Sequence, residues 1–303
     1  MSSREFEVSI SVNGRNVTGR VAGRTLLTDF LRRQAGLTGP RFGCEEGACG
    51  ACTVEMNGAT VKSCLVLAVQ ADGARVVTAE GLAKGTTLHP VQQAFVECHA
   101  VQCGYCTAGM VMSTRDFLQR HPDGNFTEEA LRAALTGNYC RCTGYNHILQ
   151  AAKVAAGKAA PLARLESAVD AKGGFIGKPI ARREDKRLVM GAGRYVDSHA
   201  TSGDLHLCIV RATVAHARIL GIDTAAALAA PGVHAVVTGK DALPHWRPLA
   251  ASIEMAGLNM PRRHAMAHDT VIFHGEPVAF VVAETPEQAE DAGALVRVEY
   301  APL

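Results

Sequence analysis

The sequence predicts an α+β protein of several domains: a small, mainly β domain, a four-helix domain, and a final domain of mixed helices and strands. Three observations support this prediction. Nine of the ten cysteines lie between Cys44 and Cys142, and only Cys208 lies beyond them. The spacing of apolar residues changes from strand-like to helix-like near residue 85. A stretch rich in alanine, glycine and lysine, typical of a linker, follows the helical part.

The bulk composition agrees with several folded domains. A chain of 303 residues with 48% hydrophobic and 20% charged residues can form two or three cores. The net charge of +2 gives no electrostatic reason to expect nucleic acid as a partner, and no segment is apolar for long enough to insert into a membrane. The first ten residues alternate, unlike a secretory leader, so a cytoplasmic location is expected. In a reducing compartment, clustered cysteines are expected to bind metals.

Residues 1–80 are expected to form the mainly β domain. Alternating apolar residues predict strands, and Asn13-Gly14 and Asn57-Gly58 are typical hairpin turns. Apolar residues at helical spacing predict a single helix. The expected elements are strands over residues 5–12, 17–21, 53–56, 60–64 and 75–78, and a helix that begins near residue 26 and is ended by Gly36.

Residues 85–157 are expected to form the helical domain, residues 158–174 a linker, and residues 175–303 the final α/β domain. Helices are expected over residues 90–98, 107–119, 127–135 and 146–156. In the final domain we expect strands over residues 205–210, 233–238, 278–283 and 296–300, and helices over residues 223–230 and 286–295.

Four cysteines of the first domain have the spacing of a plant-type ferredoxin. Cys44, Cys49 and Cys52 follow C-x4-C-x2-C, and Cys64 comes later, on the second hairpin. Four thiolates around a compact [2Fe–2S] cluster need a tightly wrapped backbone, which glycines allow. The glycines available in this loop are Gly43, Gly47 and Gly50. The alternative is a zinc site or buried free thiols, but zinc usually takes two C-x2–4-C pairs, and only one lies here.

The helical domain offers a second set of four cysteines. Cys103 and Cys106 form C-x2-C, and Cys140 and Cys142 form C-x-C. Each pair precedes a predicted helix, and two helix N-termini aimed at one point would favour thiolates and an anionic cluster. Spacing alone leaves zinc open here, because two pairs of thiolates also suit that metal.

Two further cysteines are expected to be core residues. Cys98, Cys103 and Cys106 also have the spacing C-x4-C-x2-C, so Cys98 is an alternative candidate ligand. It falls within an apolar helical run, where a cysteine behaves as a small hydrophobe. Cys208 stands alone in an alternating strand and is expected to be buried in the same way.

Three motifs resemble the iron–sulfur part of the molybdenum hydroxylases, the family of xanthine dehydrogenase and aldehyde oxidoreductase. They are Gly43 to Cys52 (GCEEGACGAC), Gln102 to Thr107 (QCGYCT) and Cys140 to Tyr145 (CRCTGY), in the order found in that family. The resemblance covers residues 5–156 and implies a β-grasp, plant-type ferredoxin domain followed by a four-helix [2Fe–2S] domain. It also implies that Cys103, Cys106, Cys140 and Cys142 hold a second cluster rather than zinc.

The rest of the chain resembles the start of the family's molybdenum-binding large subunit. The matching segments are residues 177–179, 182–185, 191–195 with Asp197, 216–219, 275–279 and 298–300. This resemblance implies an α/β hammerhead domain over residues 175–303, fused to the iron–sulfur part with no flavin domain between them. The family's catalytic residues lie in later large-subunit domains, so no catalytic residue is assigned to this chain.

The resemblance implies an enzyme in which a molybdopterin centre, expected in its cytosine dinucleotide form, lies on a partner chain. Electrons would pass through the helical-domain cluster and then the plant-type cluster to a flavin or a cytochrome. FAD would be carried by a partner, if present. By analogy with relatives, Gln102 and Cys142 would approach the pterin. The expected substrates are N-heteroaromatic rings, purines or aldehydes. A free-standing, two-cluster electron carrier with an interaction domain is the alternative.

Overall fold

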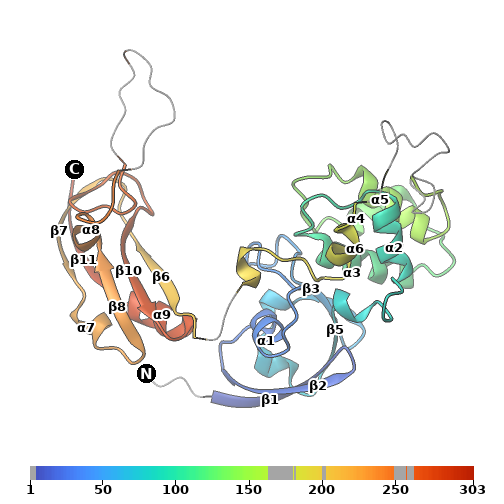
Figure 1. Ribbon diagram of the computed structural model, residues 1–303, viewed down its shortest axis with the longest axis horizontal. Coiled ribbons are helices and arrows are strands. Elements are labelled where there is room, and N and C mark those ends of the chain that lie inside the picture. The colour runs from blue at the N-terminus through green and yellow to red at the C-terminus, as the bar shows by residue number, and fades with distance from the viewer. Residues whose placement is uncertain (1–4, 163–179, 181, 200–202, 249–256, 258–262) are drawn as a thin grey trace. The chain divides into compact units, whose positions relative to one another are not determined.

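The computed structural model describes residues 5–162, 180, 182–199, 203–248, 257 and 263–303. Contacts between residues divide the chain into two compact units, Met1–Ser198 and His199–Leu303, each described here by itself (Figure 1). The linker predicted over residues 158–174 lies largely outside the described residues.

The N-terminal part of the first unit is a five-stranded sheet with the strand order β2-β1-β5-β3-β4 (Figure 1). Strand β5 runs parallel to β1, and the other neighbouring strands are antiparallel. Helix α1 buries Leu27, Phe30 and Leu31 against Val8 and Ile10 of β1. The elements are β1 (Glu5–Val12), β2 (Arg15–Ala22), α1 (Leu27–Arg33), β3 (Thr53–Met56), β4 (Ala59–Lys62) and β5 (Arg75–Val77), with short 3₁₀ turns η1 (Ser63–Leu65), η2 (Ala68–Ala71) and η3 (Ala79–Gly81). The predicted ferredoxin-like domain is confirmed.

The helical part of the first unit has its own core. The four predicted helices are present as α2 (Pro90–Glu97), α3 (Thr107–Gln119), α4 (Glu128–Ala134) and α5 (Asn146–Ala155). A short fifth helix, α6 (Asp185–Val189), was not predicted. It buries Leu188 and Val189 in the same core as α2, α3 and α5. The segment after the predicted linker therefore packs on the helical domain.

The second unit contains two three-stranded antiparallel sheets, β6-β10-β8 and β11-β7-β9. Helix α9 begins after the capping residue Thr285 and packs against β6 and β10. The four predicted strands are confirmed, whereas β7, β9 and α8 were not expected. The elements are β6 (His206–Arg211), β7 (Ala217–Asp223), α7 (Ala225–Leu228), β8 (Val233–Thr238), α8 (Gly239–Ala242), β9 (Thr270–Val271), β10 (Pro277–Ala283), α9 (Pro286–Gly293) and β11 (Arg297–Pro302).

Of the two cysteines expected in cores, Cys98 is fully buried and Cys208 only half-buried. Cys98 ends helix α2, is fully buried, and belongs to the helical-domain core. Cys208 is half-buried in β6 beside α9, where a Cβ added to Gly293 would come within 2.8 Å of its sulfur. Among the helices of the described residues, none has the length and apolar character needed to cross a membrane.

Candidate metal centres

The first set of thiols comes from the loop before β3 and from the turn after β4. Cys44, Cys49 and Cys52 lie in the loop, and Cys64 lies in η1. The thiols form two hydrogen-bonded pairs, Cys44 with Cys49 and Cys52 with Cys64. The fold therefore brings together the four thiols that the ferredoxin spacing predicts.

Backbone amides of the loop surround these sulfurs. The amide of Cys49 donates to the Cys44 sulfur at 3.3 Å. Burial opposes ionisation of Cys44, but the amides of Cys49, Glu46 and Ala48 donate to its sulfur and lower its pKa overall. At Cys64, burial and the neighbouring Cys52 instead raise the pKa to about 12. Neighbouring buried thiols do not ionise together without a cation, and bound iron would supply that positive charge.

Glycines allow the loop to pass close to the sulfurs, as predicted. A Cβ added to Gly43 would lie 2.6 Å from the Cys49 sulfur, well inside contact distance. Gly47 and Gly50 have φ angles of +79° and +73°, a backbone region that favours glycine.

The second set of thiols comes from the two loops that precede α3 and α5. The thiol of Cys103 is hydrogen-bonded to that of Cys142, and the thiol of Cys106 to that of Cys140. Each cysteine of C-x2-C thus contacts one cysteine of C-x-C. Cys98 belongs to neither pair, since its thiol interacts with the backbone of Leu162.

Helix starts and hydroxyl groups shape the second set. Cys106 is the N-cap residue of α3, and burial and the neighbouring Cys140 raise the pKa of its thiol. Burial opposes ionisation of Cys140, but the Thr143 hydroxyl, 3.1 Å from its sulfur, and nearby amides lower its pKa overall. In this set, as in the first, the pKa of one thiol is lowered, that of Cys140, while the pKa of its neighbour Cys106 is raised.

The arrangement of the thiols fits two-iron clusters. Each set forms two contacting pairs of thiols, and a [2Fe–2S] cluster takes four cysteine thiolates. Together with the amides that point at sulfur, this donor set suits an anionic iron–sulfur group.

A dense contact joins the first thiol loop to the helical domain. The Gly50 carbonyl accepts hydrogen bonds from the Thr53 amide, the Thr53 hydroxyl and the Asn138 side chain, at 3.1, 2.7 and 3.1 Å. A Cβ added to Gly109 of α3 would lie 2.1 Å from this carbonyl oxygen. The loop and the helix therefore meet backbone to backbone, and only glycine fits at position 109.

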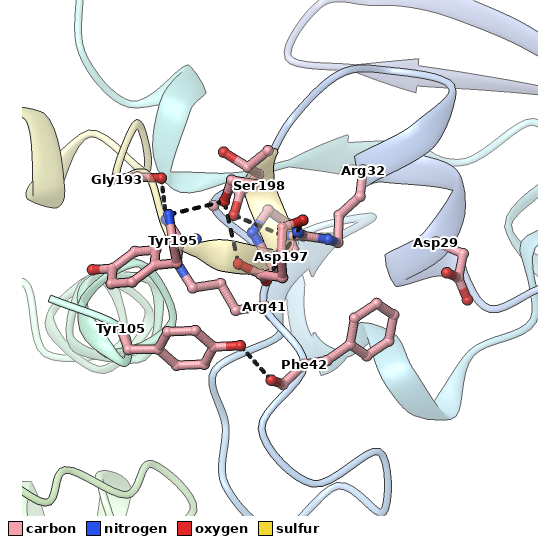
Figure 2. A network of polar contacts seen from close by, with 12 residues as sticks. Asp29, Arg32, Arg41, Phe42, Tyr105, Gly193, Tyr195, Asp197 and Ser198 are labelled. Carbon is pink, nitrogen blue, oxygen red and sulfur yellow. Dashed lines mark hydrogen bonds and ion pairs between the residues drawn. The ribbon is translucent and has the colours of Figure 1, made fainter. Parts of the chain in front are cut away.

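We call residues 182–198 the strap. This segment contacts both the β domain and the helical domain, which carry the two sets of thiols. Figure 2 shows its centre, where the fully buried Arg41 donates to the carbonyls of Gly191 and Gly193 at 3.3 and 3.2 Å. The guanidinium lies 4.3 Å from the ring centroid of Tyr195 and 5.6 Å from that of Tyr105. Its other two nitrogens have no partner, so cation–π contacts and the two carbonyls hold the charge.

Two tyrosine hydroxyls connect the thiol loops and the strap, and Figure 2 shows the first of them, Tyr105, bonded to Phe42. Tyr105, between Cys103 and Cys106, donates to the carbonyl of Phe42 at 2.5 Å, just before the first thiol loop. Tyr195 of the strap donates to the carbonyl of Cys103 at 2.7 Å. The backbones around the two thiol sets are therefore tied to each other directly.

The residues expected to approach a pterin are at the surface. Gln102 and Cys142 are both exposed. The carbonyl of Gln102 accepts a hydrogen bond at 2.8 Å from Arg182 of the strap, which is also paired with Asp185. The strap thus fixes the backbone at Gln102 and leaves its side chain accessible.

Sequence reasoning missed the strap contacts. Residues 182–185, 191–195 and Asp197 belong to the segments that resemble the family, but no sequence pattern identifies Arg41 and Arg32 as their partners. A basic residue is normally expected at the surface, so nothing in the sequence marks these two as buried contacts of a distant segment.

We expect Arg32→Met to lower the free energy of unfolding by about 2 kcal/mol, because Arg32 holds the strap and the thiol loop together. Its guanidinium donates to the carbonyls of Thr38 and Pro40 and pairs with Asp197 at 3.0 Å, with 9% of its side chain exposed. Denaturant unfolding of the iron-loaded chain measures this loss.

Arg33→Met is the matched control, since Arg33 adjoins Arg32 in α1. Its pair with Asp29 leaves 47% of the arginine side chain exposed, so a loss below about 0.5 kcal/mol is expected. Equal losses in the two variants would contradict the role given to Arg32.

Three known protein families match successive parts of the chain, in the order of its domains. Residues 10–87 match the model of a 2Fe-2S iron-sulfur cluster binding domain, and residues 78–153 that of a [2Fe-2S] binding domain. Residues 190–303 match the aldehyde oxidase and xanthine dehydrogenase a/b hammerhead domain. The chain is 48% identical over 156 residues to the nicotine 6-hydroxylase small subunit of Paenarthrobacter nicotinovorans, covering 52% of this chain and 93% of that one. The chain belongs to the molybdenum hydroxylase family.

A longer relative matches almost the whole of this molybdenum hydroxylase chain. The aldehyde oxidoreductase of Megalodesulfovibrio gigas is 35% identical over 310 residues, which cover 97% of this chain. The solved structure of aldehyde oxidoreductase from Desulfovibrio gigas superposes with a TM-score of 0.81, at 34% identity over 98% of this chain. The chain spans about one third of the length of these relatives.

Proposed function

We propose that this chain is the electron-transfer component of a multi-chain molybdenum hydroxylase. The observation that carries the proposal is the pair of four-thiol sets in one unit, joined by the hydrogen bond from Tyr105 to the Phe42 carbonyl. Cys44, Cys49, Cys52 and Cys64 would hold one [2Fe–2S] cluster, and Cys103, Cys106, Cys140 and Cys142 the other. When bound, such clusters supply one-electron transfer.

The chain's own residues position these groups. Loop amides donate to the sulfurs, the Thr143 hydroxyl contacts the Cys140 sulfur, and the strap holds the loop of Cys103 in place. Because Tyr105 binds the loop of the first set, the relative position of the two sites is fixed by the protein rather than by diffusion.

We propose that a partner chain carries a molybdopterin, in the cytosine dinucleotide form, near Gln102 and Cys142. The exposure of both residues supports this contact. We further propose a flavin-binding chain or a cytochrome as the electron acceptor, and a cytoplasmic location. The similarity to an aldehyde oxidoreductase, a nicotine 6-hydroxylase small subunit and a caffeine dehydrogenase subunit supports an aldehyde, N-heteroaromatic or purine substrate.

Spectroscopy and mass spectrometry of the purified complex test the proposal. We expect visible absorption from iron–sulfur charge transfer and two distinct rhombic electron paramagnetic resonance (EPR) signals after reduction. We also expect a co-purifying chain that contains molybdopterin. A colourless, zinc-loaded protein would contradict the cluster assignment, and two clusters without any molybdenum-containing partner would favour a free-standing electron carrier.

A further inference from the structure

Lys62, at the end of β4, places an amino group against the first set of thiols. Its Nζ donates to the Thr53 hydroxyl at 2.9 Å and to the Gly137 carbonyl at 3.0 Å. The two contacts come from β3 and from the turn after α4, so the amino group is held from both domains. Among the described residues, no carboxylate forms an ion pair with it.

All four thiols of the first set act electrostatically on Lys62. Burial lowers the pKa of Lys62 overall, and the thiols of Cys52, Cys49, Cys64 and Cys44 oppose that effect by favouring its charged form. Its hydrogen-bond partner Thr53 directly follows Cys52 in the chain. The amino group is partly buried, so solvent screens these interactions less than at an open surface. The carboxylates of Glu45 and Glu46 in the same loop are exposed and therefore better screened.

Near the second set, Arg182 lies close enough to Cys103 to interact electrostatically, but its guanidinium is bound to Asp185 at 2.5 Å. That carboxylate, which is 1% exposed, offsets the positive charge of Arg182. Lys62 has no such carboxylate partner among the described residues.

We propose that Lys62 sets the reduction potential of the cluster held by Cys44, Cys49, Cys52 and Cys64. The inference rests on the proposed function, because it requires a cluster at this site. A [2Fe–2S] cluster with four thiolates is anionic and gains one more negative charge when it takes up one electron. A nearby, fixed cation stabilises the more negative form more strongly, so Lys62 raises this cluster's potential relative to that of the second cluster.

An anaerobic redox titration with dithionite, followed by EPR of both clusters, tests the role of Lys62. In Lys62→Gln, which keeps a hydrogen-bond donor but loses the charge, we expect at least a tenfold fall in the reduced-to-oxidised ratio of the first cluster at a given potential. For one electron this corresponds to a shift of about 59 mV to more negative potential. The second cluster should titrate as in the wild type.

Two variants separate charge from packing. Lys62→Arg keeps the charge and should titrate close to the wild type. Arg20→Gln removes an exposed positive charge from β2, where 75% of the side chain is accessible, and should shift neither cluster. An unchanged first potential in Lys62→Gln, or an equal shift in Lys62→Arg, would overturn the proposal.

Failure of the first cluster to assemble also tests the proposal. If Lys62→Gln does not assemble the first cluster, Lys62→Met, which keeps the aliphatic stem, takes its place in the titration. Failure of both neutral variants to assemble it, beside an intact Lys62→Arg, would show a purely structural role and refute the proposal. Absence of the first signal in the wild-type protein would instead refute the proposed function.

Discussion

Cys103→Ser is expected to abolish the EPR signal of the helical-domain cluster and to leave that of the plant-type cluster intact. Cys103 contributes one of four thiols in its set and is paired with Cys142. A serine hydroxyl is a much poorer iron ligand than a thiolate, so the remaining three cysteines would not retain the cluster. EPR of the reduced protein and iron analysis measure the loss, which should be two iron atoms per chain.

Cys98→Ser is the matched control, because Cys98 completes the competing C-x4-C-x2-C pattern. Its side chain is fully buried in the helical-domain core, where its thiol interacts with the backbone of Leu162. We expect both signals to persist in this variant. Loss of a signal in Cys98→Ser, with retention of both in Cys103→Ser, would reverse the ligand assignment.

Gly109→Ala is expected to destabilise the first unit by about 3 kcal/mol or more and to reduce occupancy of the plant-type cluster. The new methyl group would lie 2.1 Å from the Gly50 carbonyl oxygen. That carbonyl is held by Thr53 and Asn138, so it cannot move aside without losing their hydrogen bonds. Movement of the loop between Cys49 and Cys52 would then disturb the thiols. Thermal unfolding and the intensity of the first EPR signal measure both effects.

Gly221→Ala provides the comparison, since a Cβ at Gly221 in β7 meets nothing within 4 Å and its φ angle is not positive. This variant should fold and carry both clusters like the wild type. If Gly109→Ala behaves in the same way, the backbone contact between α3 and the first loop is not essential.

The candidate ligands could be predicted because the cysteine spacing that identifies them lies within a short stretch of sequence. Cys44, Cys49 and Cys52 stand at a spacing that only a few metal groups require. The helices and the alternating strands were predicted for the same reason, since each repeats its pattern over several turns or residues. Family resemblance was needed to pair the C-x2-C and C-x-C cysteines and to set zinc and Cys98 aside.

Helices and strands without a clear hydrophobic periodicity were not predicted. Helix α6 (Asp185–Val189) is too short to show helical spacing. Strand β7 contains Gly221, and its Leu220 is 58% exposed, so apolar residues do not alternate cleanly along it. Nothing in the sequence indicates that Arg41 is buried and Lys62 partly buried, because their burial depends on segments far away in the chain.

The strap has a consequence for assembly. It ends at Ser198, and the second unit begins at the next residue, His199. The hydrogen bonds of Arg41 and Arg32 therefore hold the strap to the thiol-bearing part of the same unit. Between separate chains, such a contact would weaken on dilution, whereas a covalent tether gives it an effective concentration in the millimolar range. Because the strap belongs to the same chain as its partners, a modest number of contacts keeps it bound to them at any protein concentration.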